Sequence, residues 1–470
     1  VTLFPTISLN RPVPAGGGGC FRPGGIFMTL PPYLLPLFYR YRQAGHSCYA
    51  VGGCVRDNLM GRCPQDYDLC TDATPEQTLS LFTDYRCIPT GLRHGTVTVL
   101  AEGHPVEITT FRTEGSYSDG RRPDWVAFTS SLEEDLSRRD FTVNAMAFSP
   151  KEGLIDPFGG QADLQKGVLR CVGDPTKRFS EDALRILRCL RFASLLGFSI
   201  HPDTARALKE TASRLKLVSG ERIGTELKKL LCGKQAREVL LNWPEVLGVV
   251  LPEILPMVGC PQRNPYHKYD VWGHTAAAVE AIPPKPELRL TMLFHDAGKP
   301  ACAFTDEEGV DHFYGHGKVS AQLAQAALTR LKWDRATLET VVDLCLLHDR
   351  VLVPTLPAVK RLLHKIGPER LEQLILVKEA DTLAQSALAL PRMEQHQQIR
   401  RLADQILEEQ SCFSRKDLAV NGKDLLAEGV PAGPAVGQRL EALLNAVMDG
   451  KIPNERTALL KYLREERPWT

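Results

Sequence analysis

The chain has 470 residues, of which 43% are hydrophobic and 24% charged, and its formal net charge is +1. This length is sufficient for several domains with separate cores. The near-neutral charge excludes binding of a polyanion through net charge alone, so a nucleic-acid partner would have to be held by a local basic patch.

The 13 cysteines are scattered along the chain, without a CxxC pair or a compact ligand-spaced cluster. This pattern favours reduced thiols in a cytoplasmic protein over disulfide or zinc-finger frameworks. No apolar stretch approaches the roughly 20 residues of a membrane-spanning helix. We therefore expect a cytoplasmic protein with no membrane partner, and the sequence indicates no obligatory protein partner.

The character of the chain changes at Met28. Residues 1–27 are rich in Pro and Gly and lack the basic and apolar parts of a secretory signal, so we expect a disordered or artefactual extension. A mixed α/β head is predicted over residues 28–160, with a helix near its start. Strand-like runs bounded by turn residues occur at 48–53, 66–71, 96–103, 105–112 and 142–149.

Helical periodicity dominates after residue 160 and continues to the end, interrupted by Pro and Gly. The predicted fold class is therefore α+β, an α/β head followed by an all-helical body. Residues 161–235 contain 15 Lys or Arg and 8 Asp or Glu, a local charge of 15 − 8 = +7. Such a segment is typical of nucleic-acid binding, although a solvated helical face can have the same composition.

Asp66 and Asp68 stand two residues apart in a strand-like run, so their side chains are predicted to share a face, with Cα atoms ~6.5 Å apart. Two carboxylates at this spacing can jointly hold divalent ions, as in two-metal nucleotidyl transfer. Because the ligands are oxygen atoms, Mg²⁺ is favoured. Glu107, in the run VEITTF, is the natural third catalytic carboxylate.

Gly52 and Gly53 follow the apolar run CYAV and precede a helix-like run, VRDNLMG. Glycines at such a place let backbone amides approach a phosphate closely. Taken singly, the glycine pair and the Asp-x-Asp pair are both common in ordinary surface turns. Their combination in one short stretch, followed by an acidic strand, favours a nucleotide site.

Five motifs follow one another along the chain: GGCVRD, DYDLCTDATPEQ, TGLRHGTVTV, RRDFTVNAMAF and FSEDALRILRCLRFASLLGF. Together they resemble the class II tRNA nucleotidyltransferases, members of the polymerase β-like superfamily that add CCA to tRNA. The resemblance implies a polymerase β-like head, tRNA, CTP and ATP as partners, and Mg²⁺ held by Asp66 and Asp68. The nucleotide-binding residues that it implies are Gly52, Gly53, Arg56, Arg139, Asp140 and Asn144. A purely structural ion-pair role remains open for Arg56, Asp57 and Asp140.

The run SEDALRILRCLRF is predicted to form one helix capped by Ser180, with Asp182 and Arg185 on one face. A carboxylate accepts from an exocyclic amine and a guanidinium donates to a ring acceptor, which suits cytosine and adenine and rejects uracil and guanine. The resemblance assigns this selection to the EDxxR motif that contains the pair. Arg188 and Arg191 continue the basic face toward phosphates or the RNA end. A routine surface Asp–Arg pair is the alternative.

The switch from C to A addition is placed by the resemblance partly in the polar loop before Arg139. The loop residues singled out for this control are Glu114, Tyr117, Asp119, Arg121, Arg122, Pro123 and Asp124.

A second set of candidate ligands lies downstream, where the resemblance extends to an HD-type domain. The candidate metal ligands are His274, His295, Asp296, His316, His348, Asp349 and Asp381. Imidazole combined with carboxylate suits a transition metal, such as Mn²⁺, Ni²⁺, Fe²⁺ or Zn²⁺. HD domains are generally metal-dependent phosphohydrolases. This one is expected to bind metal and either to hydrolyse a phosphate ester, for example at damaged tRNA ends, or to serve as an RNA-binding body.

The predicted organisation is an extension (1–27), a nucleotidyltransferase head (28–160), a nucleotide-selecting and RNA-binding neck (161–260), an HD domain (261–390) and a tRNA-binding tail (391–470). The predicted activity is template-independent addition of CCA to tRNA 3′ ends. The alternatives are a bacterial poly(A) polymerase, a CC-only or A-only tRNA nucleotidyltransferase, and an HD phosphohydrolase whose head only binds RNA.

Overall fold

The computed structural model describes residues 28, 30–115 and 126–466, with only the backbone of Thr90, Arg93 and Glu114. The predicted extension and the loop residues Tyr117, Asp119, Arg121, Arg122, Pro123 and Asp124 lie outside the described residues. The chain divides into two compact units. The first runs to Asp182 and includes Ile200–Thr204, and the second holds Ala183–Ser199 and the chain from Ala205 onward.

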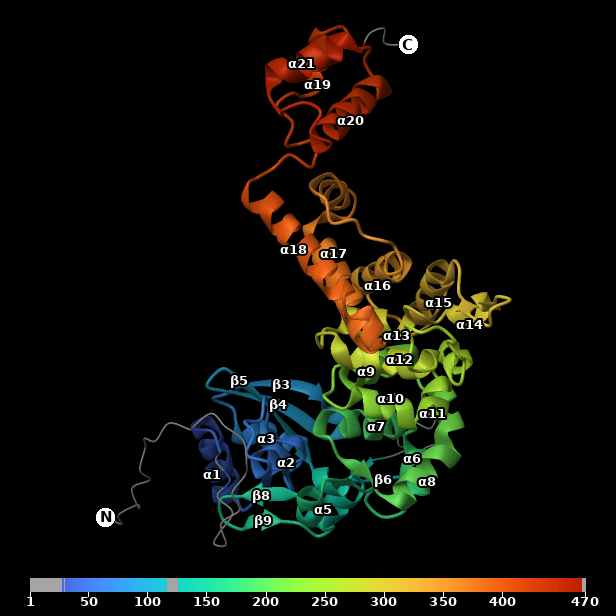
Figure 1. The fold of residues 1–470 in the computed structure, drawn as a ribbon. Helices are drawn as coiled ribbons and strands as arrows, with labels where there is room; N and C mark the ends of the chain where they lie inside the picture. The colour runs from blue at the N-terminus through green and yellow to red at the C-terminus, as the bar shows by residue number, and fades with distance from the viewer. Residues whose placement is uncertain (1–27, 29, 116–125, 467–470) are drawn as a thin grey trace. The chain divides into compact units, whose positions relative to one another are not determined.

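The first unit is built on a mixed seven-stranded sheet in the order β3-β4-β5-β2-β1-β8-β9 (Figure 1). β2 and β5 are parallel and all other neighbours in this sheet are antiparallel. The predicted α+β fold is thereby confirmed. The strands are β1 (Cys48–Val51), β2 (Asp68–Thr71), β3 (Arg86–Gly91), β4 (Thr96–Ala101), β5 (His104–Thr110), β6 (Arg112–Glu114), β7 (Val126–Phe128), β8 (Ala147–Ser149), β9 (Gly153–Ile155) and β10 (Val168–Leu169). The α-helices are α1 (Leu35–Gln43), α2 (Gly53–Leu59), α3 (Pro75–Leu81), α4 (Leu132–Ser137), α5 (Gly160–Lys166) and α6 (Pro175–Glu181).

Both faces of the central strands are covered by apolar side chains. In β1, Cys48 and Ala50 belong to one buried cluster, whereas Tyr49 and Val51 belong to another, as alternation along a strand requires. The first cluster adds side chains of α1, β2, β4 and β5, and the second adds those of α4 and β8. A polar side chain that stays accessible on these strands is therefore an exception that calls for a functional explanation.

Two predicted strands are shorter than expected. The run 66–71 becomes β2 only from Asp68, because Val51 pairs with Asp68 and the partner strand β1 then turns into α2. The strand predicted over residues 142–149 was wrong in its first half. Thr142–Asn144 forms a 3₁₀ turn, and only β8 is extended. The Asp140 carboxylate closes that turn by accepting from the Phe141 amide at 2.9 Å and from Asn144 at 3.1 Å.

The single helix predicted from Ser180 was also wrong. α6 already starts at Pro175, with Asp174 as its N-cap accepting from the Thr176 amide at 2.8 Å, so Ser180 lies in the last turn of α6. Asp182 has an extended backbone (φ −136°, ψ 104°), and α7 begins only at Leu184. An Asp N-cap followed by Pro is the stronger start signal, and the break means that Asp182 does not share a helix with Arg185.

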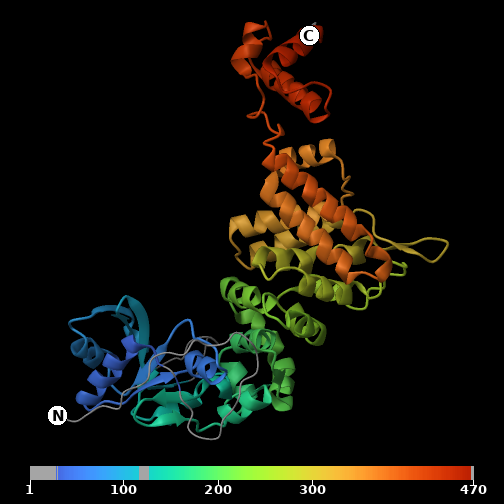
Figure 2. The ribbon, with the colours of Figure 1, turned by 60° about the vertical axis from the view of Figure 1, so that its left-hand side comes forward.

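The second unit is helical apart from short strands, as predicted (Figures 1 and 2). Within it α17 and α18 pack side by side, and a separate apolar cluster closes the C-terminal helices α19 to α21. The remaining elements of the chain are α7 (Leu184–Leu196), β11 (Ser199–Ile200), α8 (Pro202–Thr211), α9 (Gly220–Leu231), α10 (Ala236–Asn242), α11 (Pro244–Gly248), α12 (Val271–Ala281), α13 (Pro286–Phe294), α14 (Lys299–Cys302), β12 (Phe304–Thr305), β13 (Asp311–His312), α15 (His316–Arg330), α16 (Arg335–Leu347), α17 (Leu356–Ala384), α18 (Arg392–Glu408), α19 (Gly422–Ala427), α20 (Pro434–Met448) and α21 (Arg456–Glu465). Among the described helices, none is both long and apolar enough to cross a membrane.

We expect Gly160→Ala to loosen the head. A Cβ at Gly160 would lie 2.2 Å from the Thr142 carbonyl oxygen and 2.9 Å from Met146 Cγ, so α5 and the 3₁₀ turn must move apart. Hydrogen exchange should show that the opening free energy of segment 142–149 falls by about 2 kcal/mol or more.

Gly437→Ala is the matched control for this helical glycine. A Cβ at Gly437 has only the Arg415 guanidinium within reach, at 3.9 Å, so the substitution should stabilise α20 by up to ~1 kcal/mol. Equal exchange in segment 142–149 of Gly160→Ala and the parent would contradict the packing described.

Candidate functional site

Two carboxylates of the head lie opposite each other on parallel strands. Asp68, the first residue of β2, is in register with Glu107 of β5, and Asp66 precedes the strand by two residues. Asp68 remains accessible to solvent although protein surrounds it on most sides. This burial, followed by the negative charges of Asp66 and Glu107, raises the pKa of Asp68 to about 6, while Arg139 opposes the rise. Three acids that repel one another at an accessible place fit a divalent cation with oxygen ligands.

The lack of a side chain at Gly52 leaves room for the guanidinium group of Arg139. Gly52 is the N-cap of α2 with φ 76° and ψ −130°, and a Cβ there would lie 3.1 Å from Arg139 Nη1. Glycine is therefore required both for the positive φ and for the close approach of the guanidinium. Gly53 begins α2 directly after it.

Arg56, Asn144 and Asp140 form one buried network. Arg56 Nη1 donates to Asn144 Oδ1 at 2.7 Å, and Asn144 in turn donates to Asp140 at 3.1 Å. Arg56 also pairs with Asp57 at 2.8 Å. These contacts tie α2 to the 3₁₀ turn, so the geometry supports a role in ordering the pocket, and direct contact with a nucleotide stays a prediction.

Asp135 is a residue that the sequence analysis missed. Its fully buried carboxylate accepts from Arg138 at 2.7 Å and from Arg139 at 3.4 Å, and also from the Arg112 amide at 3.3 Å. Burial alone would raise the pKa of Asp135, but the two guanidinium groups hold it below its usual value. The i, i+3 and i, i+4 spacing in DLSRR could have revealed this positioning role.

The predicted base-selecting residues belong to different parts of the chain. Asp182 ends the first unit, whereas Arg185 and Arg188 lie on α7 in the second, so their joint role stays a prediction. Arg191 is buried, pairs with Glu226 of α9 at 3.2 Å and lies 4.2 Å from the centroid of the adjoining Phe192 ring. This environment supports a structural role for Arg191.

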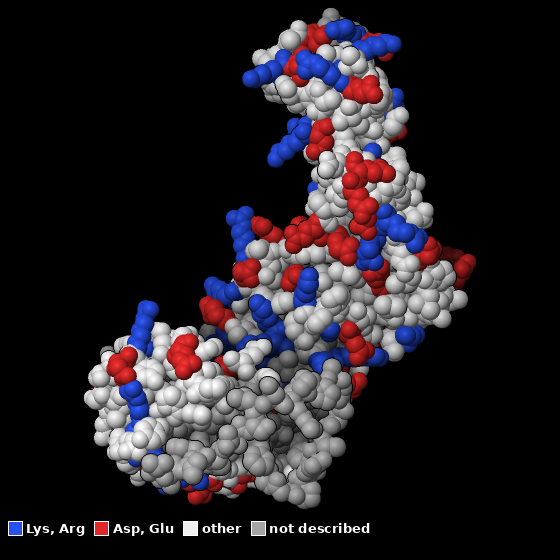
Figure 3. Space-filling view, turned by 90° about the vertical axis from the view of Figure 1, so that its left-hand side faces the viewer, with Lys and Arg blue, Asp and Glu red and all other residues white. Residues whose placement is uncertain are grey.

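The predicted basic segment 161–235 is partly neutralised by its own acids. Besides Arg191, both Arg170 and Arg178 pair within it, with Asp163 at 3.0 Å and Glu181 at 2.7 Å. On the face shown in Figure 3, basic and acidic side chains are interspersed. These acids are already subtracted in the excess of +7, so the pairs show only that three of the basic side chains are engaged within the protein.

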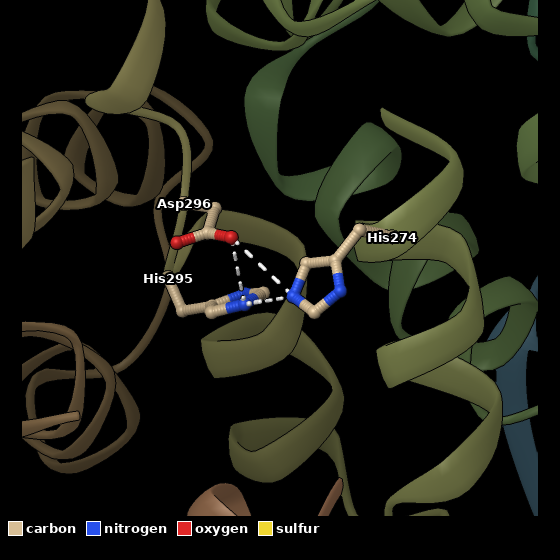
Figure 4. Close-up of side chains that lie close together, drawn as sticks. All are labelled: His274, His295 and Asp296. Atoms are coloured by element: carbon tan, nitrogen blue, oxygen red, sulfur yellow. Dashed lines mark hydrogen bonds and ion pairs between the residues drawn. The ribbon is translucent and has the colours of Figure 1, made fainter. Parts of the chain in front are cut away.

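In the second unit, six of the seven predicted metal ligands converge into one His/Asp cluster. They come from five helices or the residues that directly follow them, and they are His274 (α12), His295 and Asp296 (after α13), His316 (α15), His348 (after α16) and Asp381 (α17). The side chains of His274, His295 and Asp296 point toward one another (Figure 4). In the described part of the chain, two groups of three residues have potential metal-ligating atoms within 4.8 Å of one another, and both groups belong to this cluster. They are His274, His295 and Asp296, and Asp296, His316 and His348.

Asp296 connects two pairs of histidines. Its Oδ2 atom lies 3.4 Å from His274 Nε2 and 3.3 Å from His295 Nε2. Its Oδ1 atom lies 3.3 Å from His316 Nε2 and 3.6 Å from His348 Nε2. The carboxylate is buried, so it presents one oxygen to each pair in a water-poor interior.

The two other predicted aspartates differ. Asp381 Oδ1 lies 2.9 Å from His274 Nε2 and extends the cluster. Asp349 is 66% exposed and its nearest cluster contact is His316 Nδ1 at 4.0 Å, so it lies at the margin.

Three of the imidazoles are oriented by backbone carbonyls. The Nδ1 atoms of His295, His316 and His348 each lie 2.7 Å from the carbonyl oxygen three residues earlier. A donated Nδ1–H directs the Nε2 lone pair into the cluster, which is the form that binds a metal. Burial alone would lower the pKa of His295, but Asp296 and Asp381 raise it to about 10.

Lys299 compensates the buried negative charge, and the sequence analysis did not single it out. Its Nζ lies 2.7 Å from Asp296 Oδ2 and donates to Gln262 Oε1 at 2.8 Å. A cavity of about 520 Å³ opens onto the cluster, and Lys299, Lys378 and Arg392 line it. Cationic side chains beside a candidate metal centre suit a phosphate ester.

The chain is similar to known proteins along most of its length. Three protein families match parts of the chain. Residues 48–170 match the family described as "Poly A polymerase head domain", and residues 197–255 match "RNA and SrmB- binding site of polymerase A". Residues 318–463 match "tRNA nucleotidyltransferase domain 2". The CCA-adding enzyme of Geobacillus stearothermophilus is 35% identical over 440 residues, which cover 93% of this chain and 97% of that enzyme.

Two further comparisons agree with this. The CCA-adding enzyme of Bacillus subtilis (strain 168) is 34% identical over 438 residues, covering 92% of this chain and 97% of that enzyme. The crystal structure of the Bacillus stearothermophilus CCA-adding enzyme in complex with CTP matches with a TM-score of 0.68 at 31% identity. That match covers 93% of this chain and 98% of the crystallised one.

We expect a divalent cation to bind the head carboxylates more weakly as the pH falls below about 6. Because the pKa of Asp68 is raised from 3.8 to about 6, the metal-free head takes up a proton between pH 7 and pH 5, and that proton competes with the cation. The apparent dissociation constant for Mg²⁺, measured by calorimetry, should rise about tenfold over this range. In Asp68→Asn this part of the pH dependence should vanish, and its persistence would show that another group titrates.

Proposed function

Because this chain belongs to the family of CCA-adding enzymes, we propose that it adds CCA to the 3′ end of tRNA from CTP and ATP. The terminal ribose hydroxyl of the tRNA attacks the α-phosphate and releases its proton as the new O–P bond forms. The bond from that phosphorus to the β-phosphate bridging oxygen breaks, and pyrophosphate leaves. The observation that carries this proposal is the register of Asp68 with Glu107, which gathers negative charge at the accessible start of β2.

Nucleotidyltransferases of this kind generally use divalent metals such as Mg²⁺. Asp66 and Asp68 would hold the ion, and Glu107 would act as the third carboxylate. When bound, Mg²⁺ supplies a lower pKa for the attacking hydroxyl and stabilisation of the charge on the phosphates. Arg139, held by Asp135 beside Gly52, is the side chain we assign to the triphosphate.

Base selection is assigned to Asp182 and Arg185. The extended backbone of Asp182 separates it from the regular turns of α6 and α7. An acceptor and a donor in these two side chains would match the amine edge of cytosine and adenine. Arg188 is proposed to contact phosphates or the RNA end.

The proposal keeps the predicted division into head (28–160), neck (161–260), HD domain (261–390) and tail (391–470). The family matches begin and end at other residues, and the one over 318–463 spans the proposed boundary between HD domain and tail. A cytoplasmic location is also proposed, in keeping with free thiols at all twelve cysteines in the described residues. A poly(A) polymerase, or a head that only binds RNA, is not favoured, because the two relatives described above, which match over 93% and 92% of this chain, are CCA-adding enzymes.

The test supplies tRNA that ends at its discriminator base together with labelled CTP and ATP, separately and combined. We expect the parent chain to add two C and one A. Asp66→Ala and Asp68→Ala should each lower incorporation of both nucleotides by ~10³-fold or more, whereas Asp84→Asn, an exposed aspartate of the same unit, should not. Other products would contradict CCA addition. Long A tails would indicate a poly(A) polymerase, and addition of CC alone or A alone would indicate a CC-only or A-only tRNA nucleotidyltransferase.

The same assay with UTP and GTP tests the base-selecting pair. Asp182→Ala and Arg185→Ala should reduce the preference for CTP over UTP by ~10²-fold or more. A uniform loss with all four nucleotides would indicate a purely structural role for the residue concerned.

A second activity is favoured by the His/Asp cluster. We propose that it binds a transition metal, such as Mn²⁺, Ni²⁺, Fe²⁺ or Zn²⁺, and hydrolyses a phosphate monoester. In this step a water oxygen bonds to phosphorus, the ester P–O bond breaks, and the leaving oxygen takes up a proton. Asp296 and the inward Nε2 atoms supply the ligands, while Lys299 balances the buried charge.

Metal content and hydrolysis together test the second activity. We expect the parent chain to bind Mn²⁺ or Ni²⁺ and to release phosphate from an RNA with a 3′-terminal phosphate. Asp296→Asn should lower both by at least ~10²-fold, because second-sphere changes alone cost 10- to 100-fold, whereas Asp343→Asn, exposed on α16, should leave both unchanged. Metal binding without hydrolysis would reduce the domain to a metal-stabilised RNA-binding body.

A further inference from the structure

An exposed aromatic side chain, Tyr314, directly follows a short hairpin and lines the cavity over the His/Asp cluster. β12 and β13 pair through Phe304 with His312 and Thr305 with Asp311. Phe304 is 60% exposed and Tyr314 is 77% exposed. A large aromatic ring at this level of exposure contributes little to packing, and Tyr314, unlike Phe304, lines a polar cavity, which points to a ligand.

The rings of this hairpin are ordered relative to one another. The ring of Tyr314 lies on that of His312, with centroids 5.4 Å apart and planes at 6°. His312 is held in turn by Asp306, 2.6 Å from its Nε2 atom. Parallel rings at this centroid distance are offset, and the Tyr314 hydroxyl lies 3.4 Å from His312 Nδ1, so the imidazole covers only part of the Tyr314 ring and most of the side chain stays exposed.

This exposed ring lies close to the cluster. Tyr314 and His312 both line the cavity. Only Gly315, with φ 76°, separates Tyr314 from the cluster ligand His316. A flat group on the tyrosine can therefore belong to a ligand whose other end reaches the candidate metal centre.

Cationic side chains complete the cavity wall. Lys378 of α17 donates to the His348 carbonyl at 2.7 Å, which holds its ammonium group beside the cluster. Arg392 of α18 lies over the Tyr266 ring, with 4.8 Å between its Cζ atom and the centroid. The cavity volume, about 520 Å³, falls in the ordinary range of small-ligand sites, roughly 300–1,000 Å³.

We propose that Tyr314, backed by His312, is a nucleobase-stacking subsite of the His/Asp cavity. The ligand is a nucleotide phosphoester, free or at the 3′ end of single-stranded RNA, with its base on Tyr314 and its phosphate toward the cluster. This inference rests on the proposed phosphohydrolase function. Stacking tolerates any base, because every base has a π-face, whereas a phosphate ester without a base gains nothing from the subsite.

The experiment compares three substrates on the full chain with Mn²⁺: an RNA oligonucleotide with a 3′-phosphate, cytidine 3′-phosphate and glycerol phosphate. Tyr314→Ala should lower kcat/KM for the two nucleotide substrates by about 5- to 100-fold and leave glycerol phosphate unaffected. Tyr314→Phe, which keeps the ring, should match the parent. If kcat/KM of Tyr314→Ala falls for the oligonucleotide alone, the ligand is an RNA end. If it falls for both nucleotide substrates, free nucleotides also use the subsite.

Equal losses on all three substrates, or no loss on either nucleotide, would overturn the subsite. If the parent hydrolyses none of them, the proposed hydrolase function has failed, and stacking is then measured by binding. RNA ending in 2-aminopurine should be quenched by the parent and by Tyr314→Phe but less by Tyr314→Ala. Equal quenching by all three proteins would refute the subsite. Thermal midpoints confirm folding, since the exposed Tyr314 contributes little to the core.

Discussion

Repulsion among Asp66, Asp68 and Glu107 is the interaction on which the head depends. The sheet brings these acids together through the parallel pairing of β2 with β5, and apolar clusters on both faces prevent the strands from separating to relieve the repulsion. Burial of Asp68, together with the negative charges of Asp66 and Glu107, raises the pKa of Asp68 to about 6. The divalent cation that we propose for this place would offset the repulsion among the three carboxylates.

The His/Asp cluster also brings candidate metal ligands close together, but the side chains are of a different kind. Its ligands are mostly imidazoles, which carry no charge when neutral, and they can be buried more deeply than a set of carboxylates. Backbone carbonyls hold three rings with Nε2 directed inward, and Lys299 offsets the charge of Asp296. The donor atoms of the two regions therefore fit the different metals that we propose, Mg²⁺ with oxygen ligands in the head and a transition metal in the cluster.

Buried ion pairs position the functional groups in both units. Asp135 holds Arg138 and Arg139, while Lys299 holds Asp296. Such pairs contribute little net stability because desolvation offsets the attraction, but removing one partner leaves a buried charge and is strongly destabilising. Their value here is that they restrict where a guanidinium group or a carboxylate can point.

The sequence by itself determined the residue chemistry: two glycines before Asp66 and Asp68, an acidic strand at Glu107, and an ordered series of histidines and aspartates. These are local patterns, and short-range spacing is enough to show them. Local spacing misled at Ser180 and at Thr142–Asn144, because an Asp-Pro cap and a side-chain-closed turn outweighed the periodicity.

Only the tertiary structure decided which residues meet. Arg56 reaches Asn144 across 88 positions, and Asp296 joins histidines from four separate segments. Tyr314 lines a cavity together with residues of helices that lie far apart in the sequence. Contacts of this kind depend on how the elements pack, and no local pattern of residue types records that packing.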